Sequence, residues 1–360
     1  MRILGAPSCA GVVVAVVISC LAGPAGAEAP RVVASVKPVH SLVASVMKGV
    51  EAPRLLVDGA QSPHTYDLDP SEALAIENAD LVVWVGPTLE TFLTRPVRSL
   101  GRSEASLRLQ DVEGVRLLKT RIGGAWEAHA HDHGGHGSNG GTHGDDPAHD
   151  DEPADAHHGH ADHGHEDKHH DAHGREGDGQ GEAIPEDRID PHIWLDPDNA
   201  RAIVSALAER LSKLDPAHAE TYRTNAKATR ADLVALKQEL KARLAPVRTV
   251  PYVVFHDAYH YFESAFDVRP VGAITLSPDR KPGARRLFEI RNEIEEREAR
   301  CVFREPQFAP KLVDTVLEGT DARAGMLDPL GADLPKGPDA YFTLLSNLAD
   351  NLVDCLGEES

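Results

Sequence analysis

The sequence predicts an α/β protein of two lobes, each built around a parallel sheet flanked by helices, and three observations support this fold class. Strand-like and helix-like segments alternate over residues 31–90 and again over residues 250–356. An uninterrupted helical segment, residues 217–244, lies between them without Gly or Pro. A chain of 360 residues is also too long for one ordinary hydrophobic core.

The first alternating region begins with a β-branched run and reads as strands separated by helices. Predicted strands cover residues 31–36, 54–57 and 81–85, and predicted helices cover 41–50 and 71–78. Because a βαβα order returns each strand in the same direction, we expect a parallel sheet covered by helices.

Two helices should connect this region to the second one. Asp198 or Asn199 is expected to cap the first helix, which ends at Leu214, and Asp215-Pro216 opens the second. At a rise of 1.5 Å per residue, the segment 217–244 would be ~42 Å long. This length exceeds the diameter of one such domain and indicates a rigid helix that spans the two lobes.

The second region repeats the alternation and completes the domain division. Predicted strands are 252–255, 268–274, 299–303 and 324–327, and predicted helices are 283–298, 310–318 and 339–356. The chain therefore divides into a leader (1–27), an N-terminal lobe (28–214), a connecting helix (215–245) and a C-terminal lobe (246–360).

A histidine-rich acidic tract, residues 127–187, interrupts the N-terminal lobe. It holds 17 acidic residues against Lys168 and Arg175, so it carries −15 of the net charge of −20. The rest of the chain is only mildly acidic, which excludes the basic surface of nucleic-acid-binding proteins. With so few apolar side chains the tract is expected to be disordered.

The imidazoles of the tract indicate binding of borderline divalent cations, zinc foremost, and an inert linker is the alternative. These histidines are His129, His131, His133, His136, His143, His149, His157, His158, His160, His163, His165, His169, His170 and His173.

The N-terminus is typical of a secretory signal peptide. Arg2 provides a positive charge, residues 11–23 are apolar, and Ala25-Gly26-Ala27 matches a cleavage site. In a competing interpretation, Cys20 is acylated at a lipoprotein cleavage site. Both interpretations predict an exported protein.

The cysteines agree with export. Cys9 and Cys20 lie in the leader, which leaves Cys301 and Cys355 in an oxidising compartment. A disulfide is one possibility, and a zinc site using both thiols is the other, although the spacing is not C-x-x-C.

Three histidines outside the tract are candidates for a metal site, because each follows a predicted strand or turn. They are His64, His192 and His256. Ligands collect beyond the carboxyl ends of strands in open α/β sheets, and three imidazoles meeting there would suit zinc. His260 is not expected to join them, because His256 ends a strand and the two do not share a helix face. Glu305 could orient a histidine or form a surface ion pair.

Six motifs in this order resemble the ZnuA-type zinc-uptake receptors, the cluster 9 metal-binding proteins of ABC transporters. They are SPHTYDLDPS, NADLVVWVGPTLE, DPHIWLDP, VFHDAYHYF, CVFREPQF and LDPLG. The resemblance implies two βα sandwich lobes joined by a long rigid helix, with the metal in the cleft between them. It also implies a His-rich loop in the first lobe and a bond between Cys301 and Cys355.

The resemblance also implies a ligand set. His64, His192 and His256 carry over as metal ligands, and the fourth position falls to Asp328 or to water, because Pro63 stands where some relatives have Glu. A histidine at 256 favours Zn²⁺, since manganese prefers oxygen ligands.

The function implied is that of a monomeric periplasmic receptor. It would capture Zn²⁺ and deliver it to an inner-membrane ABC permease, with no catalysis and no nucleic-acid partner. The alternatives are a manganese or iron receptor on the same fold, a three-histidine zinc hydrolase, and a surface adhesin or metal store.

Overall fold

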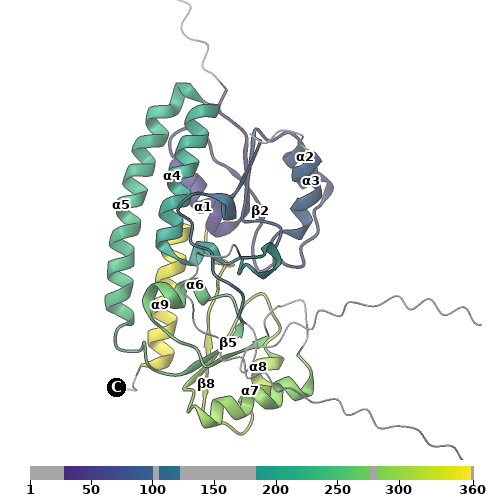
Figure 1. Ribbon diagram of the computed structural model, residues 1–360, viewed down its shortest axis with the longest axis vertical. Helices are drawn as coiled ribbons and strands as arrows, with labels where there is room; N and C mark the ends of the chain where they lie inside the picture. The colour runs from purple at the N-terminus through teal and green to yellow at the C-terminus, as the bar shows by residue number, and fades with distance from the viewer. Residues whose placement is uncertain (1–27, 100–104, 122–183, 276–281, 358–360) are drawn as a thin grey trace, which may run out of the picture.

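The computed structural model describes residues 28–99, 105–121, 184–275 and 282–357. The predicted leader and all histidines of the tract lie outside these ranges. Within them, two α/β lobes lie one above the other beside long helices (Figure 1). The predicted fold class is confirmed. Across the described residues, no helix combines the length and the apolar character needed to cross a membrane.

The N-terminal lobe contains a four-stranded parallel sheet in the order β2-β1-β3-β4. Its strands are β1 (Val32–Val36), β2 (Arg54–Val57), β3 (Leu81–Trp84) and β4 (Ser106–Arg108). Every residue of β1 and β3 is buried, as expected for central strands covered on both faces. The short strand β4 was not predicted, because its three residues carry no apolar pattern.

Three helices of this lobe follow its strands. They are α1 (Lys37–Val46), α2 (Pro70–Glu77) and α3 (Thr94–Ser99). Helix α1 begins four residues before the predicted start at 41, because Pro38 is accommodated in its first turn. Helix α2 begins with a capping box in which Asp69 accepts from the Glu72 N–H and the Glu72 carboxylate accepts from the Asp69 N–H.

Two helices then run along one side of the molecule (Figure 1). Helix α4 (Pro197–Leu214) is capped by Asp196, whose carboxylate accepts from the Asp198 N–H at 2.9 Å. The prediction of Asp198 or Asn199 as the cap was therefore wrong, because Pro197 already occupies the first helical turn. Helix α5 (Ala219–Leu244) has 26 residues and packs against α4, α1 and α9.

The C-terminal lobe repeats the architecture with a parallel sheet in the order β6-β5-β7-β8. Its strands are β5 (Tyr252–His256), β6 (Gly272–Thr275), β7 (Cys301–Arg304) and β8 (Arg323–Met326). Its helices are α6 (His260–Phe266), α7 (Ala284–Glu296), α8 (Lys311–Leu317) and α9 (Ala340–Leu356). The domain limits given above remain a prediction.

The two faces of the C-terminal sheet belong to different hydrophobic clusters. In β5, Val253 and Phe255 enter a cluster covered by α7 and α8. The alternate residues Tyr252 and Val254 enter a larger cluster that continues into the N-terminal lobe. The two lobes therefore share one core, to which α1, α4, α5 and α9 contribute.

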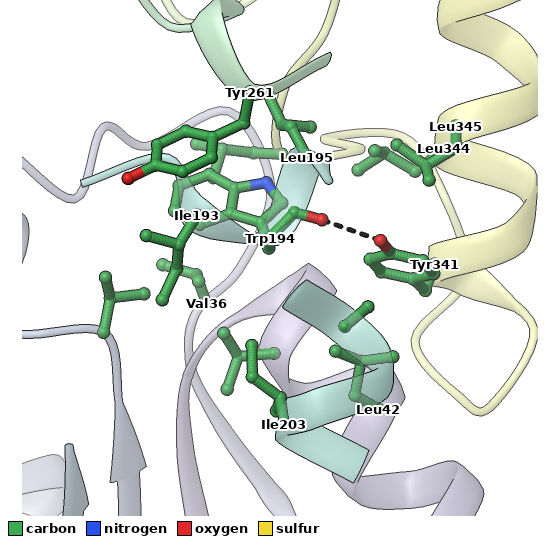
Figure 2. Close-up of a cluster of buried hydrophobic side chains, with 14 of the residues drawn as sticks. Val36, Leu42, Ile193, Trp194, Leu195, Ile203, Tyr261, Tyr341, Leu344 and Leu345 are labelled. Atoms are coloured by element: carbon green, nitrogen blue, oxygen red, sulfur yellow. Dashed lines mark hydrogen bonds between the residues drawn. The ribbon is translucent and has the colours of Figure 1, made fainter. Parts of the chain in front are cut away.

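Trp194 lies in this shared core between side chains of both lobes (Figure 2). Its indole N–H donates to the Pro329 carbonyl at 2.9 Å, and its own carbonyl accepts from the Tyr341 hydroxyl at 2.7 Å. The segment around Trp194 is thus fixed by the C-terminal lobe, although it belongs to the N-terminal half of the chain.

A disulfide joins Cys301 of β7 to Cys355 near the end of α9, with the Cα atoms 6.3 Å apart. The bond confirms the pairing implied by the family resemblance and excludes the two thiols as zinc ligands.

The mature chain should therefore contain no free thiol. Alkylation under denaturing, non-reducing conditions followed by intact-mass measurement should find no modified cysteine, whereas the reduced control should gain two labels. A closed loop of 54 residues corresponds to about 4 kcal/mol in the chain-entropy model, so reduction should lower the melting temperature. Two labels without reductant would contradict the pairing.

Candidate metal centre

Three histidines from separate segments converge in the cleft between the lobes. His64 lies in the loop after β2, His192 directly precedes the short helical turn Ile193–Leu195, and His256 is the last residue of β5. One ring nitrogen from each lies within 4.8 Å of the others. The sequence predicted these three residues as a group, and among the described residues they form the one such cluster of potential metal ligands.

The spacing of the ring nitrogens is that of ligands around a small ion. His192 Nε2 lies 3.4 Å from His64 Nε2 and 3.3 Å from His256 Nε2. Two nitrogens bound tetrahedrally to zinc at 2.0–2.1 Å are separated by ~3.3–3.4 Å. Both measured separations therefore match ligands around a tetrahedral cation, and the third pair of ring nitrogens also lies within 4.8 Å.

A buried carboxylate orients His192. Asp190 Oδ1 lies 2.8 Å from His192 Nδ1 and also accepts from the His192 backbone N–H at 3.0 Å. Because an ionised carboxylate can only accept, Nδ1 carries the proton and Nε2 presents its lone pair. Burial raises the pKa of Asp190 to about 6, which still leaves it ionised at neutral pH.

His256 has the same arrangement with a different carboxylate. Its Nδ1 lies 2.7 Å from Glu305 Oε1, and Glu305 is 2% exposed. Of the two interpretations of Glu305, orientation of a histidine is therefore correct, and a surface ion pair is wrong. Sequence reasoning missed Asp190, although its place two residues before His192 in DPHIWLDP was an available signal.

Burial also keeps His192 in the form that binds metal. Desolvation, with a smaller contribution from neighbouring His256, lowers the pKa of His192 well below its usual value. The ring is thus neutral at neutral pH and its Nε2 is free of a proton. His64 is only half-buried, so the site reaches the surface on its side.

The cavity at the three histidines is small. Its volume is about 10 Å³, close to the minimum that one water molecule needs, and Trp194, Phe308 and Pro329 contribute apolar walls. The arrangement can enclose one ion with one further small ligand.

Asp328, one of the two candidates for the fourth position, is not part of the three-histidine cluster. Its carboxylate accepts from Gln307 Nε2 at 2.8 Å and from the backbone N–H groups of Leu330 and Ala332. Gln307 lines the cavity, and its Oε1 is buried without a hydrogen-bond partner. Gln307 stands in the motif CVFREPQF, but sequence reasoning did not single it out.

The other histidines in the described ranges lie outside the cluster. His260 begins α6, and its Nδ1 is 3.8 Å from Asp190 Oδ2, beyond hydrogen-bond distance. His40 lies 3.0 Å from the Pro53 carbonyl oxygen through Nε2, and His218 lies 2.7 Å from Asp215 through Nδ1. The contacts of His40 and His218 are structural.

The chain is similar to known proteins over almost its full length. Residues 32–355 match the family model described as "ZnuA: Zinc-uptake complex component A periplasmic". The high-affinity zinc uptake system protein ZnuA of Brucella suis is 46% identical over 340 residues, which is 94% of each chain. The protein of that name from Yersinia pestis is 33% identical and covers 93% of this chain and 94% of its own.

Solved structures share the fold at lower identity. The periplasmic zinc binding protein TroA from Treponema pallidum has a TM-score of 0.67 at 19% identity, covering 92% of this chain and all of its own. A ZnuA crystal structure has a TM-score of 0.63 at 20% identity and covers 90% and 100% of the two chains. Given the family match over residues 32–355 and relatives up to 46% identical, the chain belongs to the ZnuA family of periplasmic zinc-uptake components.

Proposed function

We propose that the protein is a zinc receptor that captures Zn²⁺ with His64, His192 and His256 and releases it to an ABC permease. The observation that supports this most directly is the separation of 3.3 and 3.4 Å between the Nε2 atoms. Because His192 and His256 both direct Nδ1 at a carboxylate, their Nε2 lone pairs face each other at 3.3 Å and repel unless a cation lies between them. Zinc at 2.0–2.1 Å from each nitrogen would relieve the repulsion in the geometry that it prefers.

The donor atoms favour zinc over manganese. The three-residue cluster contains imidazoles and no carboxylate. Manganese prefers oxygen ligands, whereas zinc accepts imidazole readily. The nearby carboxylates of Asp190 and Glu305 bind the Nδ1 atoms and so contribute charge without ligation.

Water is the better candidate for the fourth ligand. The carboxylate of Asp328 is already engaged by Gln307 and two backbone N–H groups. Because Asp328 accepts from Gln307 Nε2, the amide turns its unpartnered Oε1 the other way. A metal-bound water could donate to this oxygen.

The confined space argues against a hydrolase. A zinc hydrolase needs space for its substrate beside the metal-bound water, and the cavity of about 10 Å³ is far smaller than the roughly 300–1,000 Å³ of ordinary ligand pockets. Relatives named as components of a high-affinity zinc uptake system agree with a binding protein. We infer that the chain is exported to the periplasm, binds without catalysis, and meets its permease there as a monomer.

Replacing His64, His192 or His256 with Ala should each weaken zinc binding at least tenfold, because a tetrahedral site loses one ligand. Competition with a chelator of known affinity measures the change. His218→Ala is the matched control, since His218 bonds to Asp215 outside the cleft. A His192→Ala protein with the affinity of the control would refute the ligand assignment.

Gln307→Leu should weaken zinc binding by about fivefold, since one hydrogen bond to the bound water is lost while the ligands remain. Gln110→Leu is the matched control, because Gln110 is also buried with an unpartnered Oε1 but lies outside the cavity lining. A loss as large as that of the histidine variants would make Gln307 itself a ligand. An unchanged zinc affinity would show that Gln307 makes no hydrogen bond to a metal-bound water.

Deleting residues 130–174 should preserve the tight cleft site and abolish weaker zinc binding. The segment contains 13 of the 14 tract histidines and none of the three cleft histidines. Its imidazoles must be ordered by the metal, so each should bind less tightly than the cleft. Calorimetric titration of the deleted and full-length proteins separates the two classes. Loss of the tight site on deletion would mean that the tract supplies a primary ligand, and an unchanged stoichiometry would make it an inert linker.

A further inference from the structure

The two chain segments that flank the histidine tract are paired with each other. Lys119 and Ile189 form an antiparallel bridge. The Thr120 N–H donates to the Arg188 carbonyl at 2.9 Å, and the Asp190 N–H donates to the Leu118 carbonyl at 2.9 Å. Residues 118–120 and 188–190 thus form a paired base from which the tract extends. Asp190, which orients His192, is the last residue of this base.

A single tyrosine of the C-terminal lobe bonds to both flanking segments. Tyr261 lies in α6 and is fully buried. Its hydroxyl oxygen accepts from the Leu118 N–H at 2.8 Å, and the hydroxyl donates to the Asp190 carbonyl at 3.0 Å. The backbone N–H, the carbonyl and the carboxylate of Asp190 are thus all engaged, and Tyr261 is the link to the other lobe.

Arg121 adds a second link between the same parts. Its Nε donates to Asp257 at 3.0 Å and its Nη1 donates to Glu263 at 2.7 Å. Asp257 directly follows His256, and Glu263 lies in α6, two residues after Tyr261. The guanidinium is four-fifths buried with both carboxylates, so the contact is shielded from solvent.

We propose that Tyr261, supported by Arg121, is a positioning residue that holds His192 at a fixed distance from His256 and thereby sets the rate at which metal leaves the cleft. This rests on the proposed zinc-binding function. It adds to that function a role for two residues that touch neither the metal nor its ligands.

The connection runs through short bonds from one lobe to the other. From β5, which ends at His256, the chain passes directly to α6 and Tyr261. From the Tyr261 hydroxyl, one hydrogen bond reaches Asp190, and the next reaches His192 Nδ1 at 2.8 Å. Because a metal escapes when one ligand moves away from the others, loosening this connection should increase the dissociation rate more than it changes the intact fold.

Tyr261→Phe tests the role, because it keeps the buried ring and removes only the hydroxyl. Stopped-flow transfer of zinc to a chelator should be about tenfold faster than for the unaltered full-length protein, since two hydrogen bonds are lost. Tyr222→Phe is the matched control. Tyr222 is also fully buried and its hydroxyl donates to Asp215 at 2.8 Å, but it lies in α5. Both variants should lower the melting temperature of the metal-free protein, so only the zinc off-rate distinguishes them.

An off-rate for Tyr261→Phe within twofold of the Tyr222→Phe value would overturn the proposal. If Tyr261→Phe shows no cooperative melting, the Arg121→Gln variant is tested in its place. A zinc off-rate of Arg121→Gln severalfold above that of the unaltered protein supports the proposal, and an unchanged zinc off-rate overturns it. Failure of the zinc function itself has a different signature, because the unaltered protein would then yield its zinc to the chelator at once.

Discussion

The hydrophobic core shared by the two lobes is the constraint on which the metal site depends. His192 and His256 come from opposite lobes, and their Nε2 atoms must stay 3.3 Å apart to share one ion. Apolar side chains of both sheets and of α1, α4, α5 and α9 pack into one continuous cluster. Close-packed interiors deform little, so the lobes are held as one body rather than as two halves around a flexible hinge. Trp194 illustrates this constraint. It lies two residues after His192 and is hydrogen-bonded to Pro329 and Tyr341 of the C-terminal lobe.

Two buried carboxylates behind the histidines contribute the negative charge that a bound cation requires. A divalent cation entering this cleft loses most of its hydration, and neutral imidazoles alone would not compensate its charge. Asp190 and Glu305 each place a buried carboxylate one hydrogen bond behind a histidine, so two negative charges match the two positive charges of the ion. Because these carboxylates bind Nδ1, they supply charge while leaving the coordinating atoms as nitrogen. The arrangement thereby combines a charge suited to any divalent cation with a donor set suited to zinc.

Much of this architecture follows from local sequence patterns, and the rest depends on contacts that no local pattern contains. The sequence predicted the strands β1, β3 and β5 from their apolar runs and the helix α5 from its uninterrupted length. It also predicted the three histidines that follow strands or turns. Asp328 was implied as a possible ligand by its motif, yet its oxygens accept from Leu330 and Ala332 within its own turn. The orientation of a carboxylate in a turn depends on loop geometry, which the sequence does not reveal. Likewise Asp190 and Tyr261 are 71 residues apart, so only the folded chain brings them together.

The position of the histidine tract follows from the same bonds. The described chain stops at Arg121 and resumes at Ile184, close to where Thr120 and Arg188 are already hydrogen-bonded. The free energy of closing a loop rises only slowly with its length, so a paired base tolerates a long insertion at little additional cost. That base ends at Asp190, two residues from His192. A cation-binding group tethered close to this base would have a raised effective concentration near the cleft. The pairing therefore places the two ends of the insertion next to the segment that carries His192.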